Sequence, residues 1–391
     1  MVKKYDSRWP RQPICSIQLV QKERVIVTGT TGGLGAHLLW QLLGSDRIER
    51  VWAMNRTSAK GSVRERMFAT FEDKLLDANL LKSDKLVLVD VDLEIPNLGL
   101  CDELYEEASS REIFLCRLQS FEPSIRGARN LLDLALNSTA PTGSPRFVFT
   151  SSIAVAGGFT RSGTYLKEVP VSLEGAATSI GYAQSKLVTE KLLESAKGAG
   201  LQIFIVRLGQ LAGDIKSGSW SITDWVPSLI RSSTSVGCLP EANGNISWLP
   251  LDVAARSIID VCTAREAELP SVVHISHPRP IPWVAMLCAF SAYIGSRTGS
   301  QLPIVSFEKW NKRVFEAAAS FKGSENDRYE RFPSTKIQAM VDDIALANNE
   351  LRSRGDTSDA EFGGNPRLDT TTAEAIGKTL RTTPELGAEH V

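Results

Sequence analysis

A glycine-rich turn near the N-terminus constrains the fold of this chain more than any other stretch. Residues 24–28 are an apolar, β-branched run, which is typical of a strand buried on both faces of a parallel sheet. Glycines 29, 32 and 35 follow at intervals of three, and residues 36–43 carry leucines at helical spacing. Glycines let the backbone turn sharply and approach a pyrophosphate, while the amides of the following helix point at its charge. The strand–turn–helix context therefore predicts a dinucleotide site, with a ligand-free flexible turn as the alternative.

The residues expected to contact the dinucleotide within this turn are Thr28, Gly29, Thr31, Gly32, Gly33, Leu34 and Gly35. Domains specific for NAD usually place an acid at the end of the second strand, but this chain has Asn55 and Arg56 there. A guanidinium matches a 2′-phosphate through paired hydrogen bonds, so Arg56 predicts NADPH as the cofactor. A solvated surface arginine is the alternative. Asp92 and Leu93 follow the third strand and are further candidates for contact with the adenine end of the cofactor. The alternative for Asp92 is an exposed acid in a loop.

The pattern of apolar runs predicts the fold class. Strands are expected at residues 24–28, 50–54, 85–90, 113–116, 146–150, 202–206 and 271–275. Helices are expected at residues 36–43, 102–109, 125–136, 179–196 and 253–264. This alternation predicts an α/β fold with a doubly wound parallel sheet of the Rossmann type. We expect a linker at 1–22, an NAD(P)-binding domain at 23–210 and a smaller, mostly helical substrate subdomain at 211–391, partly interleaved with the first. Residues 353–371 are polar and predict a flexible loop.

Three polar side chains are placed to do chemistry on a carbonyl. Ser151 and Ser152 lie at the carboxyl end of the fifth strand, the edge that faces the ligand crevice in open α/β sheets. Tyr182 and Lys186 are four residues apart on the next helix and therefore share a face. An ammonium beside a phenol stabilises the phenolate, which makes the phenol a better acid and base near neutral pH. We predict Ser152, Tyr182 and Lys186 as catalytic residues, with Ser151 competing for the hydroxyl role, and expect Tyr182 and Lys186 also to contact the cofactor.

Composition excludes several other function classes. Lysine and arginine number 44 against 45 acidic residues, so the net charge of −1 gives no reason to expect nucleic acid or an anionic membrane. The six cysteines form no C-x-x-C pair, and the four histidines lack metal-site spacing, so no metal is expected. No apolar run approaches the ~20 residues of a membrane span, and the first residues lack a signal-peptide core. We expect a soluble, cytoplasmic monomer.

The order of glycine turn, strand-end serine and Tyr-x-x-x-Lys helix resembles the extended short-chain dehydrogenase/reductase superfamily. Within it, the chain resembles the thioester reductase domains of fungal nonribosomal peptide synthetase-like enzymes and of carboxylic acid and aminoadipate reductases. The stretches that carry this resemblance are residues 28–35, 90–100, 120–131, 147–152, 207–227, 237–253 and 277–283. The resemblance covers roughly the whole chain and is most specific in its second half.

This resemblance implies a function and a partner. The substrate would be an acyl or aminoacyl thioester on the phosphopantetheine arm of a carrier domain. That carrier domain would belong to another chain, or this chain would be a fragment that has lost it. Tyr182 and Ser152 would polarise the thioester carbonyl, and NADPH reduction would release an aldehyde, or an alcohol after a second reduction. Residues 210–250 and those beyond 275 would bind substrate and carrier, although the tryptophans at 220, 225 and 248 fit core packing equally well. The alternative function is a ketone reductase or sugar epimerase acting on a free small molecule.

One segment departs from the family pattern. Residues 111–119 are shorter than the usual fourth-strand region by on the order of ten residues, and Arg117 replaces a small polar turn beside the cofactor. This strand is central in a Rossmann sheet, so the deletion predicts a gap in the sheet or an impaired nicotinamide site. A mis-spliced gene model would look the same. A catalytically impaired remnant is therefore a third hypothesis.

Overall fold

A computed structural model describes residues 1–6, 9–10, 22–111, 113–116, 122–139, 145–159, 165–172, 181–264, 270–354 and 360–387. Its centre is a seven-stranded sheet in the order β11-β6-β5-β4-β1-β2-β3, with every neighbouring pair parallel. The strands are β1 (Glu23–Thr28), β2 (Ile48–Arg56), β3 (Leu86–Val91), β4 (Ile113–Cys116), β5 (Arg146–Ser152), β6 (Gln202–Leu208) and β11 (Val272–Ile275). The predicted α/β class and doubly wound parallel sheet are confirmed.

The shortened fourth strand occupies the middle of this sheet. Although β4 has only four residues, it pairs with β1 on one side and with β5 on the other. Its side chains are all buried, with Ile113 and Leu115 on one face and Phe114 and Cys116 on the other. The predicted gap in the sheet is therefore wrong, because four apolar residues are enough to join both neighbours. Arg117 and the rest of the shortened turn lie outside the described residues.

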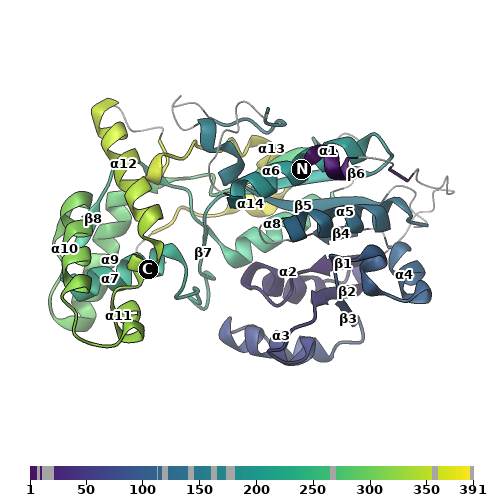
Figure 1. The fold of residues 1–391 in the computed structure, drawn as a ribbon, viewed down its shortest axis with the longest axis horizontal. Helices are drawn as coiled ribbons and strands as arrows, with labels where there is room; N and C mark the ends of the chain where they lie inside the picture. The colour runs from purple at the N-terminus through teal and green to yellow at the C-terminus, as the bar shows by residue number, and fades with distance from the viewer. Residues whose placement is uncertain are drawn as a thin grey trace.

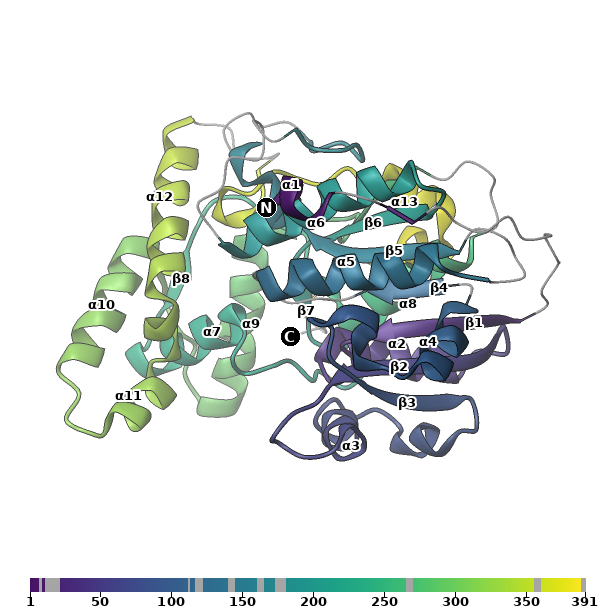
Figure 2. The same ribbon diagram turned by 45° about the vertical axis from the view of Figure 1, so that its right-hand side comes forward.

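Helices cover both faces of the sheet (Figures 1 and 2). Helices α2 (Gly33–Leu43), α3 (Val63–Asp73) and α8 (Leu251–Thr263) share one apolar core with it. Helices α4 (Asp102–Ser109), α5 (Glu122–Leu136) and α6 (Gly181–Lys197) share the core on the opposite face. Helix α3 was not predicted, although a capping box of Ser62 and Glu65 opens it and Val63, Met67 and Phe71 share its buried face.

A third apolar core lies beside the sheet in a helical region. It is built from α7 (Trp225–Val236), α9 (Trp283–Thr298), α10 (Phe307–Ala319) and α12 (Gln338–Arg354). These helices and α11 (Glu325–Arg331), which has no buried residue, stand together at the left of Figure 1. Pairs of short strands connect segments of this region. They are β7 (Leu211–Ala212) with β10 (Leu249–Pro250), β8 (Leu239–Glu241) with β13 (Ile304–Ser306), and β9 (Asn245–Ile246) with β12 (Ile281–Pro282). The chain returns to the sheet through β11 and through α13 (Thr371–Ile376) and α14 (Lys378–Thr382), which pack beside α8. The domain boundary at 210 stays a prediction.

Two segments that look irregular in sequence make ordered contacts in the structure. Within the predicted loop at 353–371, Glu361, Phe362 and Leu368 are buried, and Leu368 forms a parallel β-bridge with Leu166. The described part of the predicted linker holds a short helix, α1 (Val2–Tyr5), whose Tyr5 hydroxyl donates to Glu122 Oε1 over 2.9 Å. Both segments look polar in sequence, but a few apolar or aromatic side chains dock them. Among the described residues, no helix is long and apolar enough to cross a membrane.

Candidate active site

The turn between β1 and α2 has the geometry of a phosphate cradle. Gly29 has φ of +72°, a conformation that residues with a Cβ rarely adopt. A Cβ on Gly35 would lie 2.1 Å from the carbonyl oxygen of Gly29, so the first turn of α2 packs directly against the loop. Gly29, Thr31 and Gly32 line a pocket above the turn, and Leu34 borders the neighbouring cleft. Thr28 is buried in β1, and a Cβ on Gly33 would face Leu251 and Lys74 rather than the pocket.

Two arginines flank this pocket where β2 ends. Arg56 is exposed, and no hydrogen bond or ion pair of its guanidinium occurs within the described parts of the chain. Arg66, from α3, lines the same pocket and donates from Nη2 to the carbonyl oxygen of Arg56 over 2.6 Å. The Nε of Arg66 is buried and has no hydrogen-bond partner among the described residues. A buried donor without an acceptor is costly, so this pair of side chains is suited to an anionic ligand group.

The two remaining predicted cofactor residues, Asp92 and Leu93, differ in whether they line the pocket. Leu93 is buried and lines the pocket with Glu94, whereas Asp92 is exposed and does not line it. Asp92 instead accepts a hydrogen bond from the backbone N–H of Glu94 over 3.0 Å, which fixes the turn after β3. Sequence reasoning missed Arg66 and Glu94. The capping box that opens α3 was the available signal for Arg66.

Ser152, Tyr182 and Lys186 border one cleft of about 720 Å³ at the carboxyl edge of the sheet. Lys186 is 4% exposed, and its Nζ donates to the carbonyl oxygen of Thr150 over 2.8 Å. The same Nζ lies 5.8 Å from the centre of the Tyr182 ring. Tyr182 is 38% exposed, so its phenol is accessible from the cleft. A buried ammonium thus stands beneath an accessible phenol, as the i, i+4 spacing predicts.

The two adjacent serines have different environments. Ser151 Oγ is buried and donates to Glu190 Oε1 over 2.6 Å, and Glu190 forms a fully buried ion pair with Arg207 at 2.7 Å. Ser152 is half-buried and borders the cleft, and its Oγ accepts the backbone N–H of Ala154 over 3.2 Å. Both serines line the cleft, but the Ser151 hydroxyl is engaged by the buried Glu190 carboxylate. The geometry favours Ser152 for the catalytic role and gives Ser151 a structural one.

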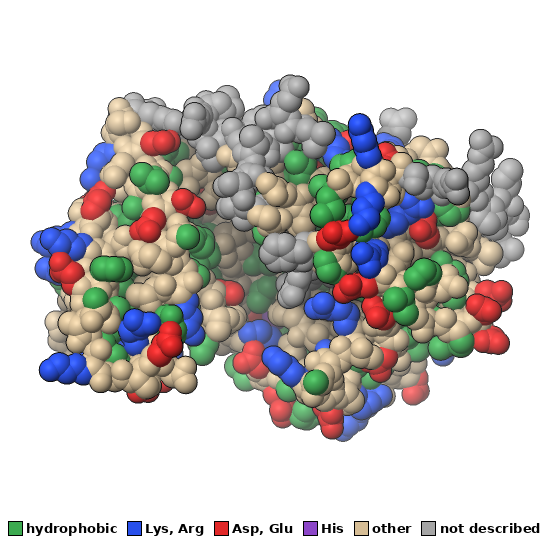
Figure 3. All heavy atoms as spheres, viewed as in Figure 1, with side chains coloured by type: hydrophobic (Ala, Val, Ile, Leu, Met, Phe, Trp, Pro, Cys, Tyr) green, Lys and Arg blue, Asp and Glu red, His purple; other side chains and the backbone are tan. Residues whose placement is uncertain are grey.

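The cofactor pocket and this cleft are continuous. Arg56, Glu94, Pro123 and Ser124 line both, so the glycine turn and the Ser152–Tyr182 pair open on the same side of the sheet. Figure 3 shows the surface hollowed between the sheet domain and the helical region. A dinucleotide extending from the arginines past the glycine turn would therefore bring its far end toward Tyr182 and Ser152.

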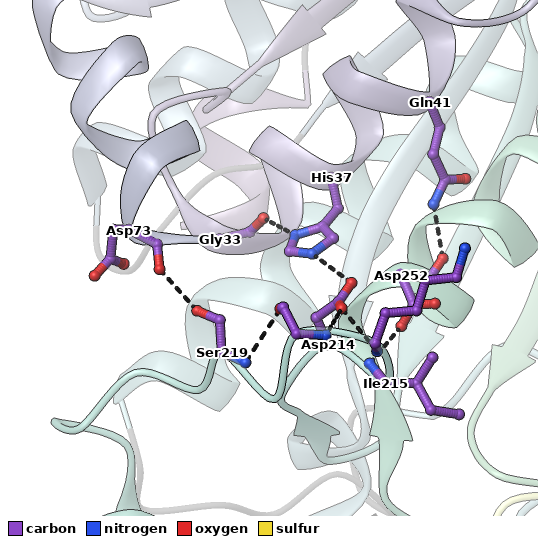
Figure 4. Close-up of polar contacts among 10 residues, drawn as sticks. Gly33, His37, Gln41, Asp73, Asp214, Ile215, Ser219 and Asp252 are labelled. Atoms are coloured by element: carbon purple, nitrogen blue, oxygen red, sulfur yellow. Dashed lines mark hydrogen bonds and ion pairs between the residues drawn. The ribbon is translucent and has the colours of Figure 1, made fainter. Parts of the chain in front are cut away.

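The loop that follows β7 is joined by hydrogen bonds to α2 and α3 (Figure 4). His37, fully buried on α2, bonds through Nδ1 to the carbonyl oxygen of Gly33 and through Nε2 to Asp214 Oδ2. Burial raises the pKa of Asp214, but the backbone N–H groups of Ser217 and Lys216 outweigh it and lower the pKa overall. Asp214 is thus held as an anion where the loop meets α2. Ser219 adds a bond to the carbonyl oxygen of Asp73 on α3.

A second, smaller pocket opens from the cleft toward the helical region. Ser152, Gly209, Gln210 and Trp225 line both cavities, and Trp248, Phe362 and Glu361 line the smaller one. Trp225 also packs edge-on against Trp248 and stacks on Phe362 at a centroid distance of 5.5 Å. The tryptophans at 225 and 248 therefore serve as core and as pocket wall at once, whereas Trp220 contributes to the core.

Comparison with known proteins agrees with this architecture. Residues 27–115 and 117–258 match the model of a family of NAD-binding domains described as male sterility protein. Adenylate-forming reductase Nps11 of Serpula lacrymans is 38% identical over 382 residues, which are 94% of this chain and 34% of that protein. The chain spans about a third of the length of the curated relatives it matches.

Solved structures share the fold over the whole chain. The terminal R domain from the myxalamid PKS-NRPS biosynthetic pathway superposes with a TM-score of 0.77 at 21% identity, covering 100% of this chain and 94% of that one. A thiolation-reductase di-domain from an archaeal nonribosomal peptide synthetase gives a TM-score of 0.67 at 17% identity, covering 100% of this chain and 76% of that one.

Proposed function

This chain belongs to the family of thioester reductase domains found in fungal adenylate-forming reductases and related synthetases, and on that premise we propose that it reduces a carrier-bound acyl thioester with NADPH. The observation that carries the proposal is the continuity of the glycine-turn pocket with the cleft of Ser152, Tyr182 and Lys186. A dinucleotide and a carbonyl substrate could then meet at the end of β5.

The side chains at that edge suit reduction of a carbonyl. Bound NADPH would supply a hydride to the thioester carbon. The hydroxyls of Ser152 and Tyr182 hydrogen-bond the carbonyl oxygen, and Tyr182 gives it a proton as charge develops there. Lys186, held by the Thr150 carbonyl, keeps a positive charge beside the resulting phenolate. The Tyr182 phenolate then takes back the hydroxyl proton of the hemithioacetal as its carbon–sulfur bond breaks, which releases an aldehyde and a thiolate that takes a proton from solvent.

The phosphorylated cofactor is favoured by the two arginines. Arg56 and Arg66 meet at one end of the glycine-turn pocket, and the buried Nε of Arg66 has no acceptor among the described residues. Guanidinium groups bind phosphate oxygens through charge-assisted hydrogen bonds. NADH would leave that Nε unpaired, so we propose NADPH.

The partner we propose is a carrier domain that presents the acyl group on a phosphopantetheine arm. The arm would enter the cleft of about 720 Å³ between the sheet and the helical region. Support comes from the solved archaeal protein that joins a thiolation and a reductase domain in one structure.

The test is an NADPH-oxidation assay of the full chain with a panel of acyl-pantetheine thioesters, followed by identification of the product. We expect thioester-dependent oxidation with release of aldehyde or alcohol, faster with NADPH than with NADH. Turnover of a free ketone or a nucleotide sugar, with no thioester reduced, would establish the alternative function instead. NADPH binding without turnover of any of these would identify a catalytically impaired domain.

A further inference from the structure

The small pocket beside Ser152 has the dimensions of a compact acyl group. Its volume is about 140 Å³. A cavity of about 150 Å³ in a protein interior holds one benzene ring. Ser152 lies at its junction with the large cleft, so a thioester carbonyl placed at Ser152 would direct the acyl chain into it. A long alkyl chain or a peptide would exceed this space.

The walls of the pocket are fixed in place. Trp225 and Phe362 stack with their ring planes 3° apart, and Phe362 also packs on Trp283 with ring centres 4.4 Å apart. Trp225 Nε1 donates to Gln210 Oε1 over 2.8 Å, which locks the indole on the side of the cleft. Met340 and Ile344 of α12 line the pocket as well. Aromatic walls held by one another keep a preformed slot, and such a slot favours a flat or compact occupant.

One carboxyl group interrupts the apolar lining. Glu361 is 8% exposed, and its two oxygens accept the backbone N–H and the hydroxyl of Ser247, each over 2.7 Å. No salt bridge to Glu361 occurs within the described ranges. Each carboxylate oxygen can accept a further hydrogen bond, so both retain acceptor capacity. Burial raises the pKa of Glu361 to about 7, against the lowering effects of the Ser247 hydrogen bonds and of the Arg367 charge.

We propose that this pocket selects the substrate of the reductase: a compact acyl group, up to the size of one ring, that bears a hydroxyl or amino donor directed at Glu361. The proposal rests on the thioester reductase function and adds its substrate class. A ring fills the space between Trp225, Phe362 and α12, while its donor binds the carboxylate.

The experiment measures kcat/KM of the full chain at pH 8 for acetyl-, benzoyl-, hydroxybenzoyl-, aminobenzoyl- and decanoyl-pantetheine. At this pH Glu361 is mostly ionised and accepts hydrogen bonds. We expect kcat/KM for a benzoyl group that bears a donor to be about 10-fold higher than for benzoyl, which is the range of one hydrogen bond to a charged group. We expect the difference from decanoyl to be larger still. The hydroxyl and amino arms identify which donor is preferred.

Two variants probe the walls separately. Glu361→Gln should reduce the donor-bearing to benzoyl ratio to within about twofold. Met340→Trp, at a position 39% exposed and therefore tolerant of a larger side chain, should lower kcat/KM for the ring substrates about 10-fold more than for acetyl. Equal turnover of decanoyl and hydroxybenzoyl, or an unchanged ratio in Glu361→Gln, would overturn the proposal while the reductase function stood.

Binding of the corresponding non-reducible amides can be measured by the quenching of tryptophan fluorescence. This measurement distinguishes failure of the reductase function from failure of the pocket assignment. If the hydroxybenzoyl amide binds about 10-fold more weakly to Glu361→Gln, yet no thioester is reduced by the wild type, the proposed function fails and the pocket assignment survives. If the amides bind without regard to size or donor, the pocket assignment is wrong.

Discussion

Tyr182 and Lys186 differ in burial, and that difference defines their predicted roles. The phenol reaches the cleft, whereas the ammonium lies beneath it against the Thr150 carbonyl. Tyr182→Phe removes the proton donor and keeps the ring, so we expect turnover to fall at least about 100-fold. NADPH affinity, measured by calorimetry, should change by no more than about twofold. Turnover at the wild-type rate would refute the acid role of Tyr182.

The glycines of the cofactor turn are not equivalent. A methyl group on Gly35 would lie 2.1 Å from the Gly29 carbonyl oxygen, whereas one on Gly33 would find its nearest neighbours at 3.6 Å, an ordinary contact. Gly35→Ala must therefore push α2 away from the turn, and we expect a lower melting temperature and at least about 10-fold weaker NADPH binding, on the order of a core overpacking penalty. Gly33→Ala is the matched control and should melt near the wild type. Equal melting of both variants would contradict the close packing.

Arg66 tests the choice of cofactor. Arg66→Met keeps much of the aliphatic length and removes the donors, so we expect the KM for NADPH to rise about 10-fold or more while the KM for NADH changes little. Arg64→Met is the control on the same helix, because Arg64 bonds the carbonyl oxygen of Leu81 and does not line the pocket. A parallel rise in both KM values for Arg66→Met would argue against a 2′-phosphate contact.

At the scale of single elements, α6 positions the site by its contact with β5. Tyr182, Lys186 and Glu190 recur every four residues and share one face of the helix. Glu190 holds Ser151 of β5 at 2.6 Å and Arg207 of β6 at 2.7 Å. This contact fixes the register of the helix, so that the two residues one and two turns earlier face the cleft beside Ser152.

Glu190→Gln should therefore destabilise the sheet edge. The substitution leaves Arg207 fully buried without its counter-charge, and removal of one partner from a buried ion pair costs roughly 3 kcal/mol or more. Urea unfolding followed by circular dichroism measures this loss. Glu330→Gln removes one partner of the exposed pair with Arg231 and should leave the midpoint almost unchanged. If both variants unfold at the same urea concentration, the buried pair does not anchor α6.

The elements themselves were predictable to different degrees. The strands that carry Thr28 and Ser152, and the helix that carries Tyr182, follow from local apolar patterns. The buried segment around Glu361 and Phe362 does not, since its neighbours in sequence are polar and its partners Ser247 and Trp225 lie far away along the chain. A pattern of neighbouring residues in the sequence cannot predict contacts between such distant segments.

At the scale of the whole molecule, the segment after α12 joins the helical region to the sheet. Glu361 docks on Ser247, and the Asp369 carbonyl oxygen accepts from Nδ1 of His274 in β11 over 2.9 Å. Burial and then the Arg207 charge lower the pKa of His274 to about 3, while burial raises that of Glu361 to about 7. Both groups are neutral in the folded protein near pH 6, so each links docking of this segment to pH.

The two linkages have opposite signs. Unfolded Glu361 loses its proton above its ordinary pKa of 4.5, but the folded protein keeps it to about 7, so its contribution to stability is lost as pH rises between those values. That difference corresponds to roughly 3 kcal/mol at about 1.36 kcal/mol per pKa unit. Unfolded His274 takes a proton below 6.5 and the folded protein does not until about 3, so its contribution is lost as pH falls through that range.

Comparison of the wild type with two variants should therefore reveal two opposite dependences of the free energy of unfolding on pH. Between about pH 4.5 and 7.5, the wild type should lose stability relative to Glu361→Gln by up to roughly 3 kcal/mol. Between about pH 6.5 and 4, the wild type should lose stability relative to His274→Gln. Urea titrations across pH measure both. A pH-independent difference between wild type and Glu361→Gln would show that this carboxyl ionises normally in the folded chain.

The sequence by itself determined the parallel sheet, the glycine turn and the Ser–Tyr–Lys order, because each depends on the spacing of neighbours along one strand or helix. Only the tertiary structure decided that four residues suffice for β4, that Glu190 engages the hydroxyl of Ser151, and that Arg66 joins Arg56. It also brought Glu361 to the pocket beside Ser152. These outcomes depend on contacts between distant segments, whose geometry is set by packing of the whole core rather than by any local pattern.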